Sequence, residues 1–325
     1  MPKLNMVQAI QFALDQEMGL DERVLVMGQD IAVNGGVFRA TEGLLDKYGS
    51  ERVMDTPLAE SAILGTAIGM SQAGLRPVTE MQFSGFSYYA LQQLESSAAR
   101  WRSRTQGQFP VSLVMRMPYG GGVRALEHHS ESREATFAHF PGVKVLIPSG
   151  PRNARALLAA AIRAEDPVVF MEPKRSYRAF REEVPEEPEV MEIGKAQVVR
   201  EGKDLTLVAW GAMMRPALEA VDKLTEQGVD VELIDVLSIS PLDGDTITAS
   251  VRKTGRCVVV QEAPRTLGLS SEIITRINDH ALMYLEAPVG RVTGYDVVTP
   301  NFGRENYYLP SADQILKTAQ STLSF

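Results

Sequence analysis

The chain has 325 residues with 33 basic and 41 acidic side chains, so its formal net charge is −8. Its content of 44% hydrophobic and 23% charged residues is typical of a globular protein with a buried core, and it excludes disordered and collagen-like classes. The acidic balance lacks the clustered Lys and Arg that binding to nucleic acid requires, and at roughly 150 residues per domain the length suggests two domains.

Short apolar strands alternate with amphipathic helices in the first half of the chain, which is typical of a parallel sheet wrapped by helices. The predicted strands cover residues 24–27, 77–82, 111–117, 143–147 and 168–171. The predicted helices cover residues 6–18, 57–72, 86–104 and 152–164. Asn5 is the expected cap of the first helix, and Pro57 is expected at the first position of the second helix.

A stretch rich in Pro and Glu between residues 172 and 192 disfavours both helix and central strand. We therefore expect a linker over residues 181–204, between one domain at 1–180 and another at 205–325. The second domain repeats the α/β alternation. Its predicted strands cover residues 205–210, 229–236, 256–261 and 291–295, and its predicted helices cover residues 213–227, 243–251, 267–281 and 311–323.

The single cysteine, Cys257, lies in an apolar run and is expected to be a buried core thiol. One cysteine makes no internal disulfide, which fits a reducing compartment. No stretch approaches the roughly 18 apolar residues of a membrane span. Residues 1–20 lack the basic head and apolar core of a secretion signal, so we expect a cytoplasmic protein.

Residues 120–125 formally match the dinucleotide fingerprint G-x-G-x-x-G, but Pro118 precedes them and no amphipathic helix opens at Gly122. The preferred interpretation is a glycine loop that lets another ligand or backbone segment approach closely. The sequence contains no G-x-x-x-x-G-K-[ST] motif and no G-x-S-x-G motif. The sequence therefore gives no motif that would indicate a nucleoside-triphosphatase or a serine hydrolase.

The chain has four histidines: His128, His129, His139 and His280. Adjacent side chains point apart in regular structure, so the pair at 128 and 129 disfavours a zinc site. A histidine in a glycine-rich loop suits proton transfer near neutral pH, and the alternative is a surface or structural histidine.

Glu60 is the other candidate for chemistry. It precedes residues 62–70, which are almost all apolar and small and predict a helix buried on nearly all sides. Glu60 would then be a poorly hydrated carboxylate, stabilised by the helix dipole. Two roles fit such a group: an acid that only caps the helix, or a carboxylic acid that gives a strong hydrogen bond to a cofactor nitrogen.

Eight segments, taken in order and spacing, resemble the beta subunit of the thiamine-diphosphate-dependent decarboxylase component of 2-oxo acid dehydrogenase complexes. They are residues 35–38, 55–60, 80–83, 116–122, 128–132, 172–174, 253–256 and 286–288, and the resemblance covers nearly the whole chain. It implies two three-layer α/β/α domains, a transketolase-like pyrimidine-binding domain at 1–180 and a transketolase-type C-terminal domain at 205–325. It also implies a heterotetramer of two alpha and two beta subunits.

The resemblance implies an oxidative decarboxylation of a 2-oxo acid, either pyruvate or a branched-chain acid, with acyl transfer to lipoamide on the dihydrolipoyl acyltransferase. Glu60 matches the glutamate that hydrogen-bonds the aminopyrimidine nitrogen of the cofactor, and His129 matches a histidine that transfers protons during acyl transfer. The remaining cofactor-binding matches are Leu58, Ala59, Gln82 and Phe86. The substrate-loop matches are Arg116, Gly120, Gly121, Gly122 and His128.

A structural potassium site is also implied, at Leu113, Ala161, Ile162, Ala164 and Asp166. Ala164 stands where some relatives have aspartate. Gln29 stands where the family commonly has glutamate, so a carboxylate on the cofactor side is either missing or supplied by Asp30.

The sequence lacks the Gly-Asp-Gly followed by asparagine that holds magnesium and diphosphate in thiamine enzymes. The chain therefore carries half a site, the alpha subunit is expected to supply the metal and diphosphate ligands, and no decarboxylation is expected from this chain alone. Two alternatives remain: half of a split transketolase-like enzyme that accepts sugar phosphates, and a non-catalytic subunit whose C-terminal domain docks the acyltransferase.

Overall fold

The computed structural model describes residues 1–325, and the chain divides into two compact units. The first unit holds Met1–Tyr119 and Thr136–Ile193, and the second holds Gly120–Ala135 and Gly194–Phe325. The segment from residue 120 to residue 135 thus belongs by its contacts to the second unit, although both neighbouring parts of the sequence belong to the first. No helix combines the length and the apolar character that crossing a membrane requires.

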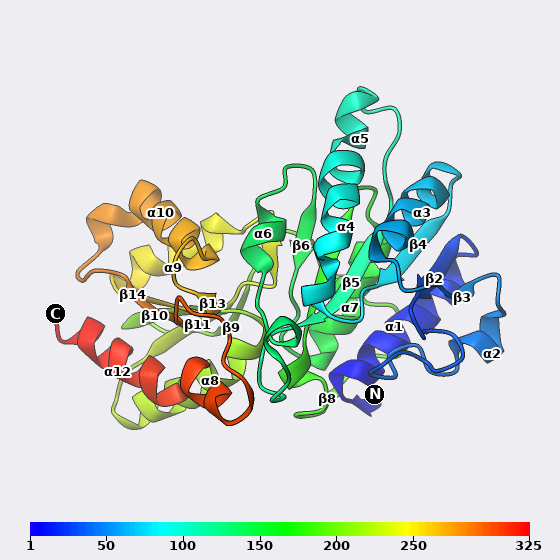
Figure 1. Ribbon diagram of the computed structural model, residues 1–325. Helices are drawn as coiled ribbons and strands as arrows, with labels where there is room; N and C mark the ends of the chain where they lie inside the picture. Colours follow the sequence, from blue (N-terminus) through cyan, green and yellow to red (C-terminus); the bar gives the residue numbers. More distant parts are fainter. The chain divides into compact units, whose positions relative to one another are not determined.

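Six parallel strands form the sheet of the first unit, in the order β6-β7-β5-β4-β2-β3 (Figure 1). They are β2 (Val24–Gly28), β3 (Val53–Asp55), β4 (Arg76–Glu80), β5 (Val114–Tyr119), β6 (Lys144–Leu146) and β7 (Val168–Pro173). A separate antiparallel pair is made by β1 (Lys3–Leu4) and β8 (Glu182–Glu183). Every residue of β2, β5 and β7 is buried, as expected for parallel strands covered on both faces.

The helices of the first unit lie on both faces of its sheet. They are α1 (Met6–Leu20), α2 (Leu44–Tyr48), α3 (Glu60–Gln72), α4 (Tyr88–Gln93), α5 (Ala99–Arg104), α6 (Glu134–Ala138) and α7 (Pro151–Arg163), and α6 begins in the second unit. The connection from β3 to β4 runs along the sheet in one direction, and the connection from β6 to β7 runs in the other. Right-handed crossovers therefore place α3 and α7 on opposite faces, where α3 packs on α4 and α7 packs on α1.

Two predicted helices differ from the observed ones. The helix predicted over residues 57–72 begins at Glu60, so Pro57 precedes the helix instead of occupying its first position. Only one face of α3 is buried, because its apolar residues follow a helical stripe while Ala62, Thr66 and Gly69 are exposed. The helix predicted over residues 86–104 is interrupted by a π-helical turn at Leu94–Ala98, between α4 and α5.

The second unit has a five-stranded sheet in the order β14-β13-β10-β11-β9. Its strands are β9 (Gln197–Arg200), β10 (Leu205–Ala209), β11 (Val231–Asp235), β13 (Cys257–Pro264) and β14 (Gly290–Gly294); the short β12 covers Ser238–Ser240. All neighbours in this sheet are parallel except β9, which runs antiparallel to β11. The sequence did not predict β9, because its residues alternate between exposed and half-buried and so lack an apolar run. Cys257 is fully buried, as predicted.

The helices of the second unit are α8 (Met214–Glu226), α9 (Gly244–Thr254), α10 (Leu269–Ala281), α11 (Glu305–Tyr308) and α12 (Ala312–Leu323). α8 packs on α12, and α9 packs on α10. The α8 and α12 layer encloses a core that includes Leu207, Leu233, Val260 and Ile315. Asp243 and Ser311 accept backbone hydrogen bonds at the starts of α9 and α12, which fixes where these two helices begin.

Candidate active site

The carboxyl edge of the first sheet collects most of the polar residues that the sequence singles out. Register pairs Gly28 with both Asp55 and Glu80, so the segments that follow β2, β3 and β4 begin at the same level. Gln29 and Asp30 follow β2, and Gln82 follows β4. In open α/β sheets ligands bind at the carboxyl ends of the strands, so this edge is the candidate active site.

Glu60 is the first residue of α3 and is 7% exposed. Its Oε1 accepts a long hydrogen bond of 3.5 Å from the side-chain amide of Gln29, which is also buried. The positive end of the helix dipole favours a carboxylate at this position. A buried carboxylate with a single long hydrogen bond has capacity for a further donor, such as a protonated or amino-substituted nitrogen heterocycle.

Gln29 itself is a neutral donor, so no second carboxylate faces Glu60 from this position. Asp30 is exposed, and its carboxylate accepts a hydrogen bond of 3.2 Å from the side-chain amide of Gln82. This contact holds the Gln82 amide beside the end of β2.

Aromatic rings line the same edge. Phe86 lies in a short 3-10 helix at Ser84–Ser87, half-buried, with its ring edge-on to Phe83 at 5.7 Å between centroids. Phe83 contacts Phe38 at 5.6 Å, and Phe38 contacts Tyr177 at 5.1 Å. Tyr177, Phe38, Phe83 and Phe86 thus form a row of rings in contact, and Phe86 is the last ring of the row. Leu58, in the extended segment before α3, is 81% exposed, and Ala59 next to it is half-buried.

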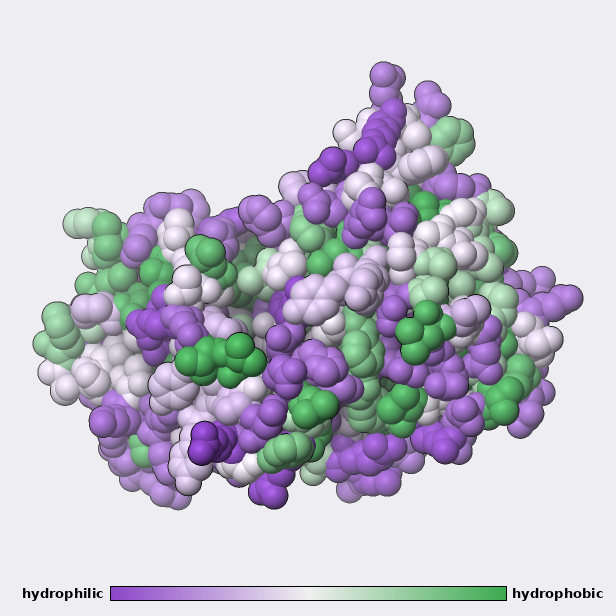
Figure 2. Space-filling view, viewed as in Figure 1, coloured by the Kyte–Doolittle hydropathy of each residue, from purple (hydrophilic) through white to green (hydrophobic).

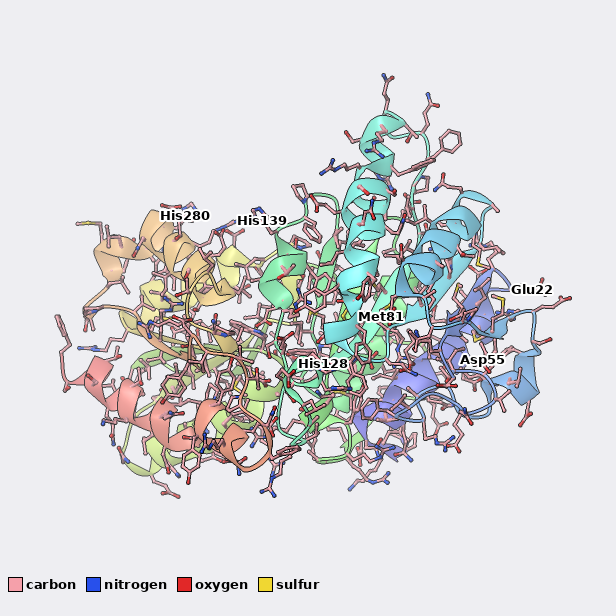
Figure 3. The ribbon with its side chains drawn as sticks, viewed as in Figure 1. Glu22, Asp55, Met81, His128, His139 and His280 are labelled. Carbon is pink, nitrogen blue, oxygen red and sulfur yellow. The ribbon has the colours of Figure 1, made fainter.

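Asp55 orders the loop that follows β2. Its carboxylate accepts hydrogen bonds from the backbone amides of Ala32, at 2.7 Å, and Val33, at 3.2 Å. Farther along, Gly36 has a φ of +81°, and a Cβ there would lie 3.3 Å from the Glu80 carboxylate. The motif at residues 35–38 therefore needs glycine both for its backbone conformation and for this close approach. Asp55 is labelled in Figure 3. The same figure labels Met81, which is buried and lies between Glu80 and Gln82 in the sequence.

Arg116, predicted to be part of a substrate loop, lies inside β5 and is 2% exposed. Its guanidinium binds Glu172 through two hydrogen bonds of 2.8 Å and also pairs with Glu80. The Tyr177 hydroxyl donates to Glu172 at 2.5 Å. Although burial favours the neutral form, Glu172 and Glu80 raise the pKa of Arg116. Burial raises the pKa of Glu80, and Glu172 adds to this shift.

This network joins three strands beneath the candidate site, because Arg116 on β5 lies between Glu80 at the end of β4 and Glu172 near the end of β7. The sequence motifs at residues 80–83 and 172–174 contain both glutamates, but nothing in the sequence indicates that they share one arginine.

The histidines occupy different positions. His128 and His129 lie in a 3-10 helix at Glu127–His129 of the second unit, half-buried, with ring centroids 4.3 Å apart. Their loop also contains Gly120, Gly121 and Gly122, and its backbone amides bind two carboxylates of the second unit. His139 and His280, both labelled in Figure 3, are exposed. No group of three or more His, Cys, Asp and Glu side chains is placed to hold a metal ion.

Several oxygen atoms of the implied potassium site already bind positively charged side chains of this protein. Arg76 donates to the carbonyl oxygens of Ile162, at 2.9 Å, and Ala164, at 3.1 Å. Asp166 binds both Arg102, at 2.5 Å, and Lys144, at 3.2 Å. The Leu113 and Ala161 carbonyls accept backbone hydrogen bonds. A potassium ion would meet three positive side chains at these acceptors, so these residues fit the ion poorly.

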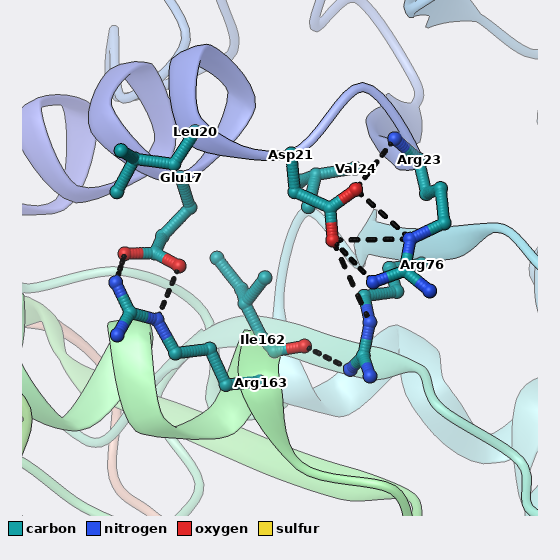
Figure 4. Close-up of a pocket in the computed structure, with 8 residues that line it drawn as sticks. All are labelled: Glu17, Leu20, Asp21, Arg23, Val24, Arg76, Ile162 and Arg163. Atoms are coloured by element: carbon teal, nitrogen blue, oxygen red, sulfur yellow. Dashed lines mark hydrogen bonds and ion pairs between the residues drawn. The ribbon is translucent and has the colours of Figure 1, made fainter.

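A surface pocket of about 340 Å³ lies beside Arg76, at the amino end of the strands (Figure 4). Its lining contains three ion pairs: Glu17 with Arg163 at 2.8 Å, Asp21 with Arg23 at 2.8 Å, and Asp21 with Arg76 at 3.8 Å. Arg23 holds the pKa of Asp21 at about 2. Because these charges are paired with each other and lie at the opposite end of the strands from Glu60, this pocket is not part of the candidate active site.

Comparisons with known proteins define the class. Residues 2–179 match the family model of the transketolase pyrimidine-binding domain, and residues 194–315 match that of the transketolase C-terminal domain. A solved structure described as a split-gene transketolase, an inactive beta4 tetramer, superposes with a TM-score of 0.83 at 23% identity and covers 99% of both chains. At that identity the likeness shows the fold alone, which is transketolase-like as predicted.

Sequence relatives are closer. Pyruvate dehydrogenase E1 component subunit beta of Bacillus subtilis (strain 168) is 49% identical over 325 residues, all of both chains. The protein of the same name from Acholeplasma laidlawii is 49% identical over 312 residues, 96% of this chain and 95% of the relative. The chain therefore belongs to the family of beta subunits of the pyruvate dehydrogenase E1 component, which confirms the resemblance seen in the sequence.

Proposed function

We propose that the chain is the beta subunit of a thiamine-diphosphate-dependent decarboxylase component that acts on pyruvate in the cytoplasm. The acetyl group passes to lipoamide on a dihydrolipoyl acyltransferase. The observation that carries the proposal is Glu60, a buried carboxylate at the start of α3 with one long hydrogen bond, at the carboxyl edge of a parallel sheet. The relatives named pyruvate dehydrogenase favour pyruvate over a branched-chain acid.

The residues at this edge fit an aminopyrimidine ring. Glu60 offers a poorly hydrated carboxylate to a ring nitrogen, and the half-buried ring of Phe86 offers a stacking surface. The Gln82 amide, held by Asp30, and the exposed Leu58 side chain complete the set of proposed contacts.

Thiamine diphosphate, when bound, supplies the carbanion chemistry that decarboxylates 2-oxo acids. The chain's own residues orient the ring and handle protons. Glu60 holds a proton at the ring nitrogen, which is the role of a carboxylic acid in a poorly hydrated site. His129 exchanges a proton with the acyl acceptor, a general acid–base role that histidine side chains commonly take.

An alpha subunit completes the site in the proposed assembly of two alpha and two beta chains. It brings the ligands for magnesium and diphosphate, because this sequence has no Gly-Asp-Gly motif followed by asparagine. The exposed face of α3 leaves room for a partner next to Glu60, because its residues Ala62, Thr66 and Gly69 have small side chains. The space-filling view shows hydrophobic patches among hydrophilic ones on the visible face (Figure 2).

The proposal is tested by expressing the chain with and without its alpha subunit and measuring carbon dioxide release in the presence of thiamine diphosphate and magnesium. Activity is expected only from the complex, with pyruvate preferred over 2-oxoisovalerate by about tenfold or more, because a few methylenes change transition-state binding by about 1–3 kcal/mol. Activity of the chain alone, or preferential turnover of a sugar phosphate, contradicts the proposal; the second result indicates a split transketolase-like enzyme.

A further inference from the structure

The glycine loop at residues 120–122 is held in place by two buried carboxylates from distant parts of the chain. Both carboxylates and the loop belong to the second unit. Glu262 lies on β13 and is 3% exposed, and Glu305 is the first residue of α11 and is 1% exposed.

Glu262 binds the start of the loop and its return. Its Oε1 accepts hydrogen bonds from the Gly121 amide, at 2.6 Å, and from the Ser132 hydroxyl, at 3.0 Å. The Gly120 amide donates to the Glu131 carbonyl at 3.0 Å, which brings the two ends of the loop together. One carboxylate oxygen therefore joins both sides of the segment that contains the two histidines.

Glu305 binds the middle of the loop with both of its oxygens. Oε1 accepts from the Gly122 amide at 2.8 Å, and Oε2 accepts from the Arg124 amide at 2.9 Å. Arg124 has a φ of +57°, a left-handed conformation that a residue with a side chain rarely adopts. An external acceptor at its amide compensates for that conformation, since hydrogen bonds to carboxylates are stronger than neutral ones.

The glycines make this arrangement possible. A Cβ on Gly120 would lie 2.6 Å from Oε1 of Glu262, and a Cβ on Gly121 would lie 2.8 Å from Oε1 of Glu305. The space that any side chain would need is thus taken by the two carboxylates. The close approach that the glycine motif indicates in the sequence is made by Glu262 and Glu305.

We propose that Glu262 and Glu305 are positioning residues, which act on the proposed reaction by fixing the loop that carries His129. The inference rests on the proposed function for the role of His129, but the anchoring of the loop is measurable without activity. Loss of either carboxylate removes the acceptor of the loop amides that it binds, and the loop then samples other conformations.

The test uses the reconstituted complex of alpha and beta chains, with Glu262→Ala and Glu305→Gln compared to wild type by hydrogen exchange. Glu262→Ala removes the acceptor of the Gly121 amide, and Glu305→Gln leaves one acceptor oxygen where the two oxygens of Glu305 accept from Gly122 and Arg124, so these amides are expected to exchange about tenfold faster or more. Amides of β2 should keep their wild-type rates. The matched control is Glu272→Gln, an exposed carboxylate paired with Arg276 on α10, which should change neither exchange nor activity.

A second variant removes no carboxylate. Gly121→Ala places a methyl group against Glu305, and Gly121 does not have a left-handed φ, so the backbone itself tolerates alanine. This variant should accelerate exchange at the same loop amides. It also separates loss of anchoring from loss of a buried charge.

The positioning role requires that kcat for transfer to lipoamide falls while carbon dioxide release with an artificial electron acceptor is retained. Unchanged exchange in all three variants would overturn the anchoring. Faster exchange with unchanged transfer would overturn the positioning role. If Glu60→Ala keeps full activity while Glu305→Gln frees the loop, the proposed function fails and the anchoring stands.

Discussion

Arg116 and Glu172 form a buried ion pair with two hydrogen bonds of 2.8 Å beneath the carboxyl edge of the first sheet. Such a pair is costly to break because the remaining partner keeps its charge in a poorly hydrated place. Glu80 shares the same guanidinium, so one arginine serves two carboxylates.

Arg116→Met is therefore expected to destabilise the protein by roughly 3–5 kcal/mol, since it leaves two buried carboxylates without a cation. The two glutamates should differ. Glu80→Gln should cost less than Glu172→Gln, because the pKa of Glu80 is already raised by burial while Glu172 accepts from both Arg116 and Tyr177. Urea unfolding of the three variants measures this, and an Arg116→Met protein as stable as wild type would contradict it.

The free energy of unfolding is expected to depend on pH through the side chain of Glu134. It is fully buried, one oxygen accepts from the Trp210 indole at 3.3 Å, and burial, with Glu262 nearby, raises its pKa to about 7. The folded state therefore binds a proton between pH 4.5 and 7 that the unfolded state releases, so stability falls as pH rises through this window. By linkage the loss amounts to about 3 kcal/mol.

Glu134→Gln should remove this slope, because the amide keeps an acceptor for Trp210 and does not titrate. The measurement is the free energy of unfolding at pH 5, 6, 7 and 8 for wild type and variant. Parallel curves for the two proteins would show that Glu134 is not the group responsible.

We expect the thermal stability of the protein to be independent of potassium, because Arg76 occupies the carbonyl oxygens of the implied potassium site. Because its guanidinium already binds the carbonyls of Ile162 and Ala164, replacing potassium by sodium or choline at constant ionic strength should leave the thermal midpoint unchanged within about 1 °C. Arg76→Met should lower stability by about 1–3 kcal/mol, since two carbonyls lose their donor. A midpoint of the wild-type protein that rises specifically with potassium would restore the potassium site.

Much of the fold follows from residue patterns, and the exceptions have physical causes. Strands β2, β7, β10 and β13 are rich in apolar residues, so the sequence predicts them within a few residues. Pro57 suggests a helix start that the structure does not use, since the chain stays extended until Glu60. The π-helical turn after α4 inserts no proline or glycine, so no residue indicates it.

The candidate site also contains residues that the sequence indicates and residues that only the structure reveals. Glu60 is buried because it begins the one buried face of α3, which continues with Ile63 and Leu64, and its proposed role follows from the resemblance carried by the motif at residues 55–60. The partners Glu262 and Glu305 lie 141 and 183 residues from the amides they bind, and neither stands in a recognisable pattern. Contacts of that separation are set by the packing of the second unit and are not encoded in local spacing.

The central claim is that the Glu60 carboxylate holds a proton at the cofactor ring in the assembled enzyme. The direct test is the rate of pyruvate decarboxylation by the complex with Glu60→Ala and Glu60→Gln, with binding of thiamine diphosphate measured by calorimetry and Glu272→Gln as the control. We expect kcat to fall about 100-fold or more in both Glu60 variants, as for loss of a positioned acid–base group, while the control is unaffected. Full activity of Glu60→Ala with cofactor bound would contradict the claim.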